Sequence, residues 1–361
     1  MRLPSFVSLF AVLLLATGAG CDRAGSSETT AALEKPAPPA PLPADVPQFN
    51  ADTAYAYTAR QVAFGPRVPN SAAHRACGDW LVATLKRHGA TVETQEFDQM
   101  AFNGQLLRLR NIVAQVRPEA TKRIALAAHW DTRPFADRDP VNKNAPFDGA
   151  NDGAAPVGQI LEIVRQLSIT DAGVGVDILF FDGEDYGHDE GSQAELTNML
   201  AGRGQDSWCL GSQYWAKNRL PKDSKPVYGI LLDMTGGQGG RFSREELSRK
   251  SAPQALNLVW QTGQRLGFGG YFLDNPSPPI TDDHVYMNQA GLPTLDIIDH
   301  VPYGNEYFPA YHHATTDNMT LIDRATLRAV GQTVLTVLFI EGAANRPATP
   351  AATSAAPAPA A

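Results

Sequence analysis

Short apolar runs that alternate with helical patterns are the feature of this sequence that most limits its fold. Five runs have the length of a strand and lack the strict alternation of a half-exposed strand, so we expect strands that are buried on both faces. These runs are Ile112–Val116, Ile124–Ala128, Ile178–Phe181, Tyr228–Leu232 and Thr294–Ile298.

Helical patterns separate and follow these strands. Apolar side chains recur at helical spacing between residues 157 and 167, with polar side chains on the opposite face. Residues 252–266 and 321–340 show helical patterns as well. Strands that alternate with helices favour right-handed crossovers and a mostly parallel sheet that is covered on both sides. The sequence therefore predicts an α/β fold with one globular domain.

The composition fits a folded protein and excludes some partners. Hydrophobic residues make up 43% of the 361 residues and charged residues 19%, which is typical of a globular chain. The 30 basic residues stand against 38 acidic ones, so the net charge of -8 argues against a nucleic-acid partner. Three cysteines cannot form a disulfide scaffold. Cys77 and Cys209 either pair after export or are buried thiols, and we favour buried thiols.

The two ends of the chain are expected to lie outside the globular domain. Arg2, an apolar run over residues 6–16 and small residues before Cys21 predict a signal peptide over residues 1–20. The run is too short for a membrane span, which needs about 20 apolar residues. Cys21 resembles the lipid-modified cysteine of a bacterial lipobox, so we expect an exported lipoprotein anchored to a bacterial membrane and facing the periplasm. A soluble secreted form is the alternative.

Segments rich in alanine and proline follow the signal and end the chain. Such segments have too little apolar surface to offset the entropy lost on ordering. We therefore expect a disordered tether over residues 21–46 and a disordered tail over residues 345–361. The globular domain is expected over residues 47–344.

Acidic and histidine side chains follow the predicted strands or lie in the loops between elements. In open α/β sheets, sites form beyond the carboxyl ends of the strands, so we expect these groups to meet at one rim of the sheet. The groups are His129 and Asp131, Asp182 to Asp185, Asp233, Asn151 and Asp152, and His312 and His313.

A single acid in such a place is usually a turn or cap residue, and Asp152 is well placed to cap a helix. Five groups on one rim are harder to explain in that way, because clustered carboxylates repel each other unless a cation or a proton compensates them. Aspartate, glutamate and imidazole are suitable ligands for a catalytic zinc ion. The sequence contains no G-x-S-x-G, H-E-x-x-H, G-x-G-x-x-G or P-loop motif that would indicate another chemistry.

Seven stretches of the chain match a known superfamily. They are AHWDTRPFAD at 128–137, GANDGA at 149–154, DILFFDGEDYG at 177–187, WCLGSQYWAKN at 208–218, YGILLDM at 228–234, TDDHVYMNQAGLPTLDII at 281–298 and HHATTDN at 312–318. In these stretches the chain resembles the co-catalytic zinc aminopeptidases of the bacterial leucyl-aminopeptidase type. Within that superfamily it resembles above all the zinc-dependent glutaminyl cyclases. The resemblance implies a mostly parallel central mixed sheet flanked by helices, of the phosphorylase/hydrolase-like type.

The resemblance also implies a ligand set. It places one Zn²⁺ on Asp152, Asp185 and His313, with a fourth position open for substrate, and makes Glu184 the general acid/base. The other metal position of the aminopeptidases corresponds to His129 and Asp233. Because these groups are present, a second Zn²⁺ is expected if the protein is an aminopeptidase.

Two further acids are implied to act beside Glu184. In the cyclases, the acid that corresponds to Asp233 joins a hydrogen-bond network beside the catalytic glutamate. Asp282 precedes an Asp-His pair, where the cyclases carry an acid and the aminopeptidases usually carry a serine. Asp233 and Asp282 are therefore the expected catalytic partners of Glu184.

The chain departs from the cyclase pattern at His312, where tryptophan is common. Either His312 or His313 is then a candidate for the zinc-binding histidine. We favour His313, because residues 316–318 keep the family's spacing to the last helix.

The expected activity is glutaminyl-peptide cyclotransfer, in which N-terminal glutamine of a peptide or protein becomes pyroglutamate and ammonia leaves. The first alternative is a zinc aminopeptidase of the same superfamily, with Glu184 as the base that activates a zinc-bound water. The second is a non-catalytic exported binding lipoprotein. The complete ligand set argues against this last reading, because buried carboxylates are costly to keep without a function.

Overall fold

The computed structural model describes residues 41–188 and 206–346. The predicted signal peptide, Cys21, most of the tether and most of the tail lie outside the described residues. The predicted domain limits at residues 47 and 344 stay predictions. No helix of the described ranges has both the length and the apolar character that a membrane crossing requires.

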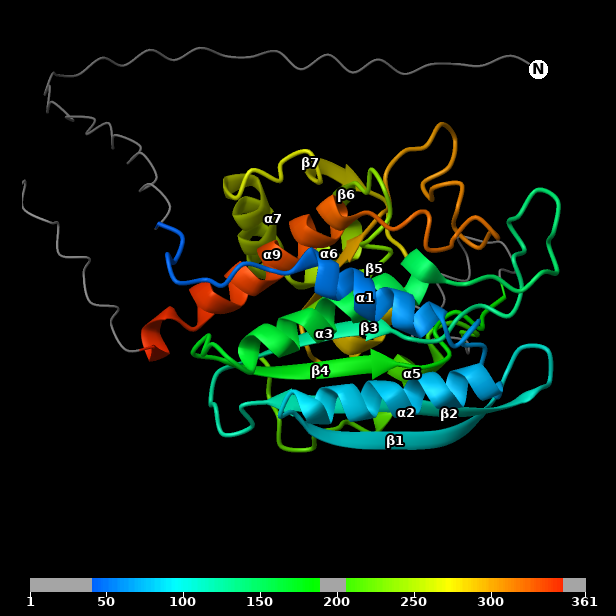
Figure 1. The fold of residues 1–361 in the computed structure, drawn as a ribbon, viewed down its shortest axis with the longest axis horizontal. Coiled ribbons are helices and arrows are strands. Elements are labelled where there is room, and N and C mark those ends of the chain that lie inside the picture. The colour runs from blue at the N-terminus through cyan, green and yellow to red at the C-terminus, as the bar shows by residue number, and fades with distance from the viewer. Residues whose placement is uncertain (1–40, 189–205, 347–361) are drawn as a thin grey trace, which may run out of the picture. The chain divides into compact units, whose positions relative to one another are not determined.

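A six-stranded mixed sheet forms the centre of the domain (Figure 1). Its strand order is β1-β2-β4-β3-β5-β8. Strands β4, β3, β5 and β8 run parallel to one another, β2 runs antiparallel to β4, and β1 runs antiparallel to β2. This arrangement confirms the predicted mixed, mostly parallel sheet. The strands are β1 (Thr91–Met100), β2 (Leu106–Val116), β3 (Arg123–His129), β4 (Gly175–Phe181), β5 (Gly229–Asp233) and β8 (Thr294–Ile298).

The five predicted strands correspond to β2, β3, β4, β5 and β8. Every residue of β3, β4 and β8 is buried, which agrees with strands that are covered on both faces. The sequence analysis missed β1, in which exposed positions predominate, and the small parallel pair of β6 (Phe242–Glu245) and β7 (Phe272–Ser277).

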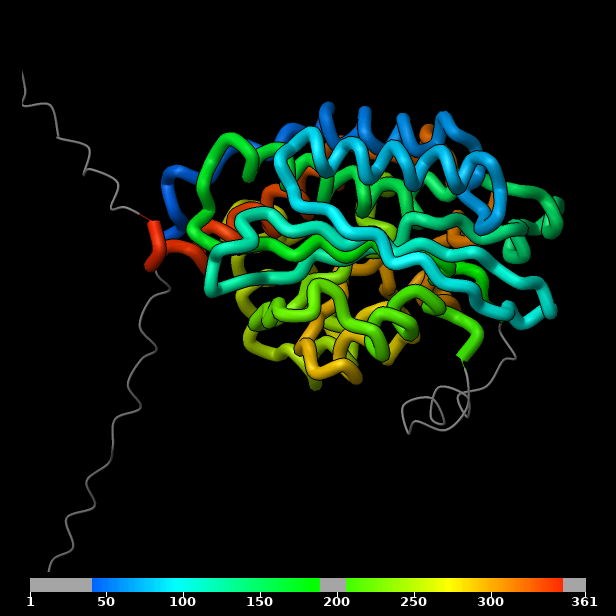
Figure 2. The backbone as a smooth tube through the Cα atoms, turned by 90° about the horizontal axis from the view of Figure 1, so that it is seen from below, coloured from blue at the N-terminus to red at the C-terminus, as the bar shows by residue number. Residues whose placement is uncertain are grey.

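Helices cover both faces of the sheet, as Figures 1 and 2 show. One face packs in a large core with helices α1, α2, α3, α7 and α9, while the other packs on Trp215 of α5 and Met287 of α8. The predicted helical segments correspond to α3, α7 and α9. The helices are α1 (Ala51–Val62), α2 (Ala72–Arg87), α3 (Ala155–Leu167), α5 (Leu210–Lys217), α6 (Glu246–Ser251), α7 (Pro253–Arg265), α8 (Asp283–Gln289) and α9 (Arg324–Glu341).

The polar groups of the predicted site come from one edge of this sheet. His129 is the last residue of β3, residues 182–185 follow β4, and Asp233 ends β5. Since β3, β4 and β5 run parallel, their carboxyl ends bring these groups to the same rim.

Asp152 reaches the rim from a distorted turn before α3. The turn over residues 150–154 contains non-helical backbone at Asp152 (φ -83°, ψ 96°) and Gly153 (φ 93°, ψ -53°). A Cβ atom on Gly153 would lie 2.8 Å from the carbonyl oxygen of Asp131, and its positive φ disfavours other residues as well. Glycine at this position therefore lets the chain present Asp152 to the site instead of using it as a helix cap.

Candidate metal centre

Two histidines and three aspartates meet at the rim of the sheet. His313 Nε2 lies 3.0 Å from Asp185 Oδ1 and 3.7 Å from Asp152 Oδ2. On the other side of Asp152, His129 Nε2 lies 3.0 Å from Asp152 Oδ1 and 3.3 Å from Asp233 Oδ1. The structure thus brings together all three predicted ligands, together with the two groups predicted for a second ion.

Several polar atoms of this cluster are buried and lack hydrogen-bond partners among the described residues. Asp152, Asp185 and His313 are each no more than 5% exposed. Asp152 Oδ2, Asp185 Oδ1, Asp233 Oδ1 and both ring nitrogens of His129 have no hydrogen-bond partner among the described residues. Buried acceptors are normally satisfied. A cluster of unsatisfied carboxylate and imidazole atoms is suited to a divalent cation, and its oxygen and nitrogen donors fit Zn²⁺.

The pKa values of two carboxyl groups in the cluster are raised. Burial, reinforced by the nearby Asp152 carboxylate, raises the pKa of Asp185 above its ordinary value. Burial also raises the pKa of Asp233, to about 7, although the His129 ring, 3.3 Å away, acts against the rise. A bound cation would remove this penalty, because it stabilises the ionised carboxylates.

Arg133 and Asp137 support the two ligands on the His313 side. The Arg133 main-chain N–H donates to Asp185 Oδ2 at 3.0 Å, and its guanidinium donates to the carbonyl oxygens of Asp185 and Gly187. The same guanidinium is paired with Asp137, whose Oδ1 lies 3.6 Å from His313 Nδ1. A carboxylate on the far nitrogen of a ligand histidine fixes the orientation and tautomer of the ring.

Asp317 and Arg67 support the turn that carries Asp152. The Asp317 carboxylate accepts the main-chain N–H groups of Asn151 at 2.7 Å and Asp152 at 3.1 Å. The fully buried Arg67 guanidinium donates to the carbonyl oxygen of Gly149 at 2.7 Å and to that of Asp148. The sequence analysis used residues 316–318 only as a spacing and missed both supports, since each is a contact between distant parts of the chain.

Glu184 lies beside the cluster, and its side chain is 13% exposed. Asp131 accepts the main-chain N–H of Glu184 at 3.1 Å, and the Cys209 thiol donates to Glu184 Oε1 at 3.3 Å. Burial raises the pKa of Glu184 well above its ordinary value; the charge of His129 acts against this rise, and the like charge of Asp282 adds to it. A carboxyl group with a raised pKa is suited to move protons near neutral pH.

Asp282 lies next to Glu184, as the sequence analysis expected. One ligand atom each from Glu184, Cys209 and Asp282 lies within 4.8 Å of the others. Burial raises the pKa of Asp282. Asp233, by contrast, lies directly against His129, so of the two expected partners Asp282 is the one grouped with Glu184.

A second buried acidic group extends behind Asp282, and the sequence analysis did not single it out. His284 Nε2 lies 3.4 Å from Glu245 Oε2, and its Nδ1 lies 3.8 Å from Asp296 Oδ2. Burial and the charge of Asp282 raise the pKa of Asp296 well above its ordinary value. An acid in the middle of the fully buried strand β8 was the signal that could have revealed this group.

The two candidate histidines lie side by side. Their ring centroids are 3.7 Å apart, and the ring of His312 stacks on Phe308 at 4.1 Å. Both histidines can offer a ligand atom near Asp152. His313 is the one that lies within 4.0 Å of both Asp152 and Asp185 among the described residues. The choice of His313 as the zinc ligand stays a prediction that this geometry favours.

Both cysteines of the described residues are free and buried, which confirms the expectation of buried thiols for Cys77 and Cys209.

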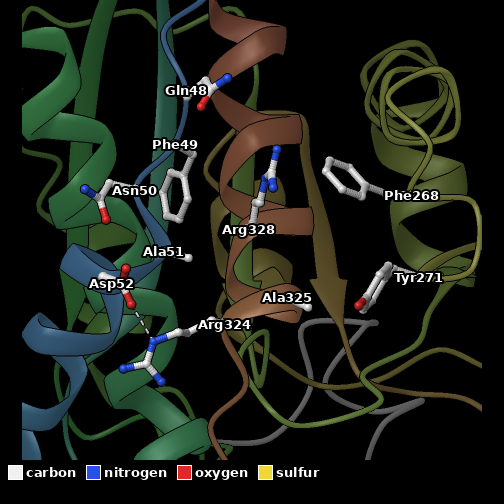
Figure 3. Close-up of a pocket in the computed structure, with 10 residues that line it drawn as sticks. All are labelled: Gln48, Phe49, Asn50, Ala51, Asp52, Phe268, Tyr271, Arg324, Ala325 and Arg328. Carbon is white, nitrogen blue, oxygen red and sulfur yellow. Dashed lines mark hydrogen bonds and ion pairs between the residues drawn. The ribbon is translucent and has the colours of Figure 1, made fainter.

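A groove of about 540 Å³ lies elsewhere, between the start of α1 and the start of α9 (Figure 3). Phe49, Phe268 and Tyr271 line it, together with Arg328 and the ion pair of Arg324 with Asp52. None of the predicted site residues lines this groove.

Comparison with known proteins decides the family. The family model described as peptidase family M28 matches residues 111–338, which contain every predicted site residue. The chain belongs to peptidase family M28. Together with the relatives described next, this match confirms the expected resemblance to zinc aminopeptidases and glutaminyl cyclases.

Solved structures align with most of this chain. The chain is similar to a Zn-dependent exopeptidase from Parabacteroides distasonis, with 48% identity and a TM-score of 0.76 over 81% of this chain and 99% of that one. It is also similar to a glutaminyl cyclase from Porphyromonas gingivalis, with 46% identity and a TM-score of 0.74 over 80% of this chain and 98% of that one. These matches confirm the predicted fold class.

A curated relative in an animal is more distant. A glutaminyl-peptide cyclotransferase-like protein of Mus musculus is 26% identical over 302 residues, which are 76% of this chain and 72% of that relative. The M28 neighbours thus include one described as a zinc-dependent exopeptidase and others described as glutaminyl cyclases. The choice between these activities depends on the residues around Glu184.

Proposed function

We propose that this M28 protein is a zinc-dependent glutaminyl-peptide cyclotransferase. It converts the N-terminal glutamine of peptides or proteins to pyroglutamate and releases ammonia. The observation that carries this proposal is the buried Asp282 grouped with Glu184, at the position where the aminopeptidases that the chain resembles usually carry a serine. Similarity to the glutaminyl cyclases of Porphyromonas gingivalis and Tannerella forsythia, each at 46% identity, supports it.

Asp152, Asp185 and His313 would hold one Zn²⁺. When bound there, the ion supplies Lewis-acid polarisation of the γ-amide carbonyl group and stabilises the negative charge that develops on its oxygen. The unsatisfied oxygens of Asp152 and Asp185 are the features of the chain that fit this ion.

Glu184 moves the protons of the reaction. Its carboxylate accepts a proton from the α-amine as the amine nitrogen attacks the γ-amide carbon, and it then delivers a proton to the departing nitrogen. One C–N bond closes the five-membered ring and the other breaks, so ammonia is the only other product. The nucleophile belongs to the substrate itself, so the site has to enforce a ring-closing conformation and to exclude water.

Asp282 and Asp233 assist by position and charge. Asp282 lies against Glu184, and its like charge is one cause of the raised pKa of the Glu184 carboxyl group. Asp233 keeps His129 in place through a 3.3 Å contact. Both acids would hold the α-amine of the substrate in register with Glu184.

An aminopeptidase is the alternative that a specific observation favours. One atom each from His129, Asp152 and Asp233 lies within 4.8 Å of the others, which gives a second ion a place next to the first. Glu184 would then act as base toward a water nucleophile. A non-catalytic binding protein is a further alternative, which the complete set of proton-transfer and ligand groups disfavours.

One assay separates these functions. The purified protein is incubated with Gln-initiated and Leu-initiated peptides, with and without chelator, while ammonia and free amino acids are measured. Ammonia from the Gln peptide without N-terminal cleavage supports the cyclotransferase. Free leucine contradicts it and supports the aminopeptidase. If the zinc-loaded protein forms neither product, the result supports the non-catalytic binding protein. A zinc content near one per chain favours cyclisation, and a content near two favours hydrolysis.

We also propose that the protein is exported and anchored by lipid at Cys21, facing the periplasm. The support is the sequence of residues 1–21, in which a charged residue, an apolar run and small residues precede the cysteine. Mass spectrometry of the mature protein tests this proposal. The expected N-terminus is a lipid-modified Cys21, and an unmodified terminus at another residue would contradict it.

A further inference from the structure

Glu184, Cys209 and Asp282 form a second group of potential metal ligands beside the candidate zinc site. Cys209 and Asp282 are buried and Glu184 is half-buried, and one oxygen, sulfur or oxygen atom from each lies within 4.8 Å of the others. We propose that this thiol–carboxylate cluster binds a thiophilic divalent cation, such as Cd²⁺ or excess Zn²⁺, and that the bound ion inhibits the enzyme by occupying Glu184. The inhibitory part rests on the proposed role of Glu184, whereas the binding part does not.

The separation of the sulfur and oxygen atoms suits chelation. Cys209 Sγ lies 3.3 Å from Glu184 Oε1. Zinc bonds of about 2.3 Å to sulfur and about 2.0 Å to oxygen, at a tetrahedral angle, place these two ligand atoms about 3.5 Å apart. The free protein therefore holds the pair close to the spacing that a metal needs. As the sulfur–metal bond forms, the S–H bond breaks and its proton passes to solvent.

Asp282 provides the third ligand atom. Its Oδ1 accepts the main-chain N–H of Asp283 at 2.5 Å and so caps α8. Its Oδ2 is buried and has no hydrogen-bond partner among the described residues, although the side chain is only 3% exposed. An unsatisfied buried acceptor carries a cost that a cation would remove. The cap fixes the side chain, and Asp282 also has a ligand atom within 4.8 Å of one each from His284 and Asp296.

The backbone holds Cys209 in this place. Cys209 has a left-handed conformation, with φ 56°, at the residue that precedes α5. Its N–H donates to the carbonyl oxygen of Glu184 at 2.9 Å, and the N–H of Leu210 donates to that of Gly183 at 3.1 Å. These main-chain hydrogen bonds hold the backbone of Cys209 beside Glu184. Cys209 itself is fully buried, so an ion would enter past the side chain of Glu184, which is 13% exposed.

The chemistry of this cluster differs from that of the candidate zinc site. Asp152, Asp185 and His313 offer oxygen and nitrogen atoms, whereas the thiol–carboxylate cluster adds a sulfur atom. Thiolate ligands favour soft cations more strongly than carboxylates do. A soft probe ion should therefore distinguish the two sites.

The test is a titration of the zinc-loaded full chain with Cd²⁺, in a Cys21→Ser background that removes the one thiol outside the described residues. The ultraviolet charge-transfer band of a thiolate–cadmium bond and the rate of ammonia release are followed together. We expect a saturable band at one Cd²⁺ per chain and a parallel loss of activity. In Cys209→Ser the band should disappear, and half-inhibition should need at least about tenfold more Cd²⁺, since even an outer-shell change costs that much.

Cys77→Ser is the matched control, because Cys77 is the other buried free cysteine of the described residues. It should keep both the band and the inhibition. Cys209→Ala, with its fold checked by thermal melting, replaces Cys209→Ser if the serine variant is unstable. Each variant is compared with its own rate in the absence of cadmium.

The proposal is overturned if no band forms, if the band persists without Cys209, or if cadmium inhibits both cysteine variants equally. The last result would place the inhibitory ion on the candidate zinc ligands. A Cys209-dependent band in a protein that releases no ammonia would keep the metal site and reject the proposed function instead.

Discussion

Strands β3 and β4 carry buried charges at both of their ends, and the two ends satisfy those charges differently. Near their start, Arg123 Nε donates to Asp177 Oδ1 at 2.8 Å, and its other N–H groups reach main-chain carbonyl oxygens. The Asp177 carboxylate also accepts hydrogen bonds from Gln115 and Ser224. This ion pair is buried, and protein groups provide hydrogen-bond partners for the guanidinium and for both carboxylate oxygens.

At the carboxyl ends of the same strands, His129 and Asp185 are just as buried but have atoms without a hydrogen-bond partner among the described residues. The comparison shows how a buried charge can be interpreted. A buried charge that protein groups satisfy fixes the packing of the strands. A buried charge that they leave unsatisfied marks a candidate site for a bound ion.

The strongest test of this comparison is removal of a proposed ligand. His313→Ala should reduce the zinc content from near one per chain to near zero and reduce ammonia release to background, because only two aspartates remain to hold the ion. His312→Ala is the control and should keep its zinc. Loss of zinc from the His312 variant with retention in the His313 variant would reverse the assignment.

Removal of the proton-transfer group should be the next largest effect. Glu184→Gln should lower kcat by about 10² to 10⁴-fold, because the amide cannot accept the proton of the attacking amine. Its zinc content should equal that of the unchanged protein. A variant that keeps most of its kcat would show that Glu184 is not the acid/base.

At the start of β3 and β4, where Arg123 and Asp177 satisfy each other, the expected effect is on the stability of the fold. Arg123→Met leaves the Asp177 carboxylate buried without its cation and should lower the free energy of unfolding by about 3–5 kcal/mol, measured by denaturant titration. Turnover per bound zinc should not change. The double variant Arg123→Met/Asp177→Leu should recover part of the loss, and no recovery would mean that the pair is not an isolated charge interaction.

The smallest expected effect concerns the support of a ligand. Asp137→Asn should weaken zinc binding by about 10 to 100-fold, because His313 loses the carboxylate near its Nδ1. With saturating zinc the variant should regain most of its activity. Asp52→Asn, which removes an ion pair in the distant groove, is the control and should bind zinc as the unchanged protein does. Equal affinities in both variants would show that Asp137 gives no support.

The sequence predicted those parts of the fold that depend on continuous apolar runs. Strands β3, β4 and β8 are buried throughout and were found, whereas β1 was missed because exposed polar residues such as Glu93 and Glu96 interrupt its pattern. The antiparallel direction of β2 has no signature in its own residues. It follows from its hairpin with β1, which the sequence analysis did not identify.

The candidate site divides in the same way. The strand-end positions of Glu184 and Asp185, and the family pattern around Asp282, were visible in the sequence. The supports were not, because Asp317 contacts Asn151 across 166 residues and Arg67 contacts Gly149 across 82. A local pattern cannot report such pairings, so they had to come from the structure.

The link between Asp317 and the turn at Asn151 and Asp152 also has a consequence for biosynthesis. During translation, Asp152 and Asp185 leave the ribosome well before His313 and Asp317. In a nascent chain, Asp152 and Asp185 therefore lack His313 and Asp317 until the last third of the chain has been synthesised and has packed against them. Shortened products that stop before residue 313 should lack a working centre, however well their first strands fold.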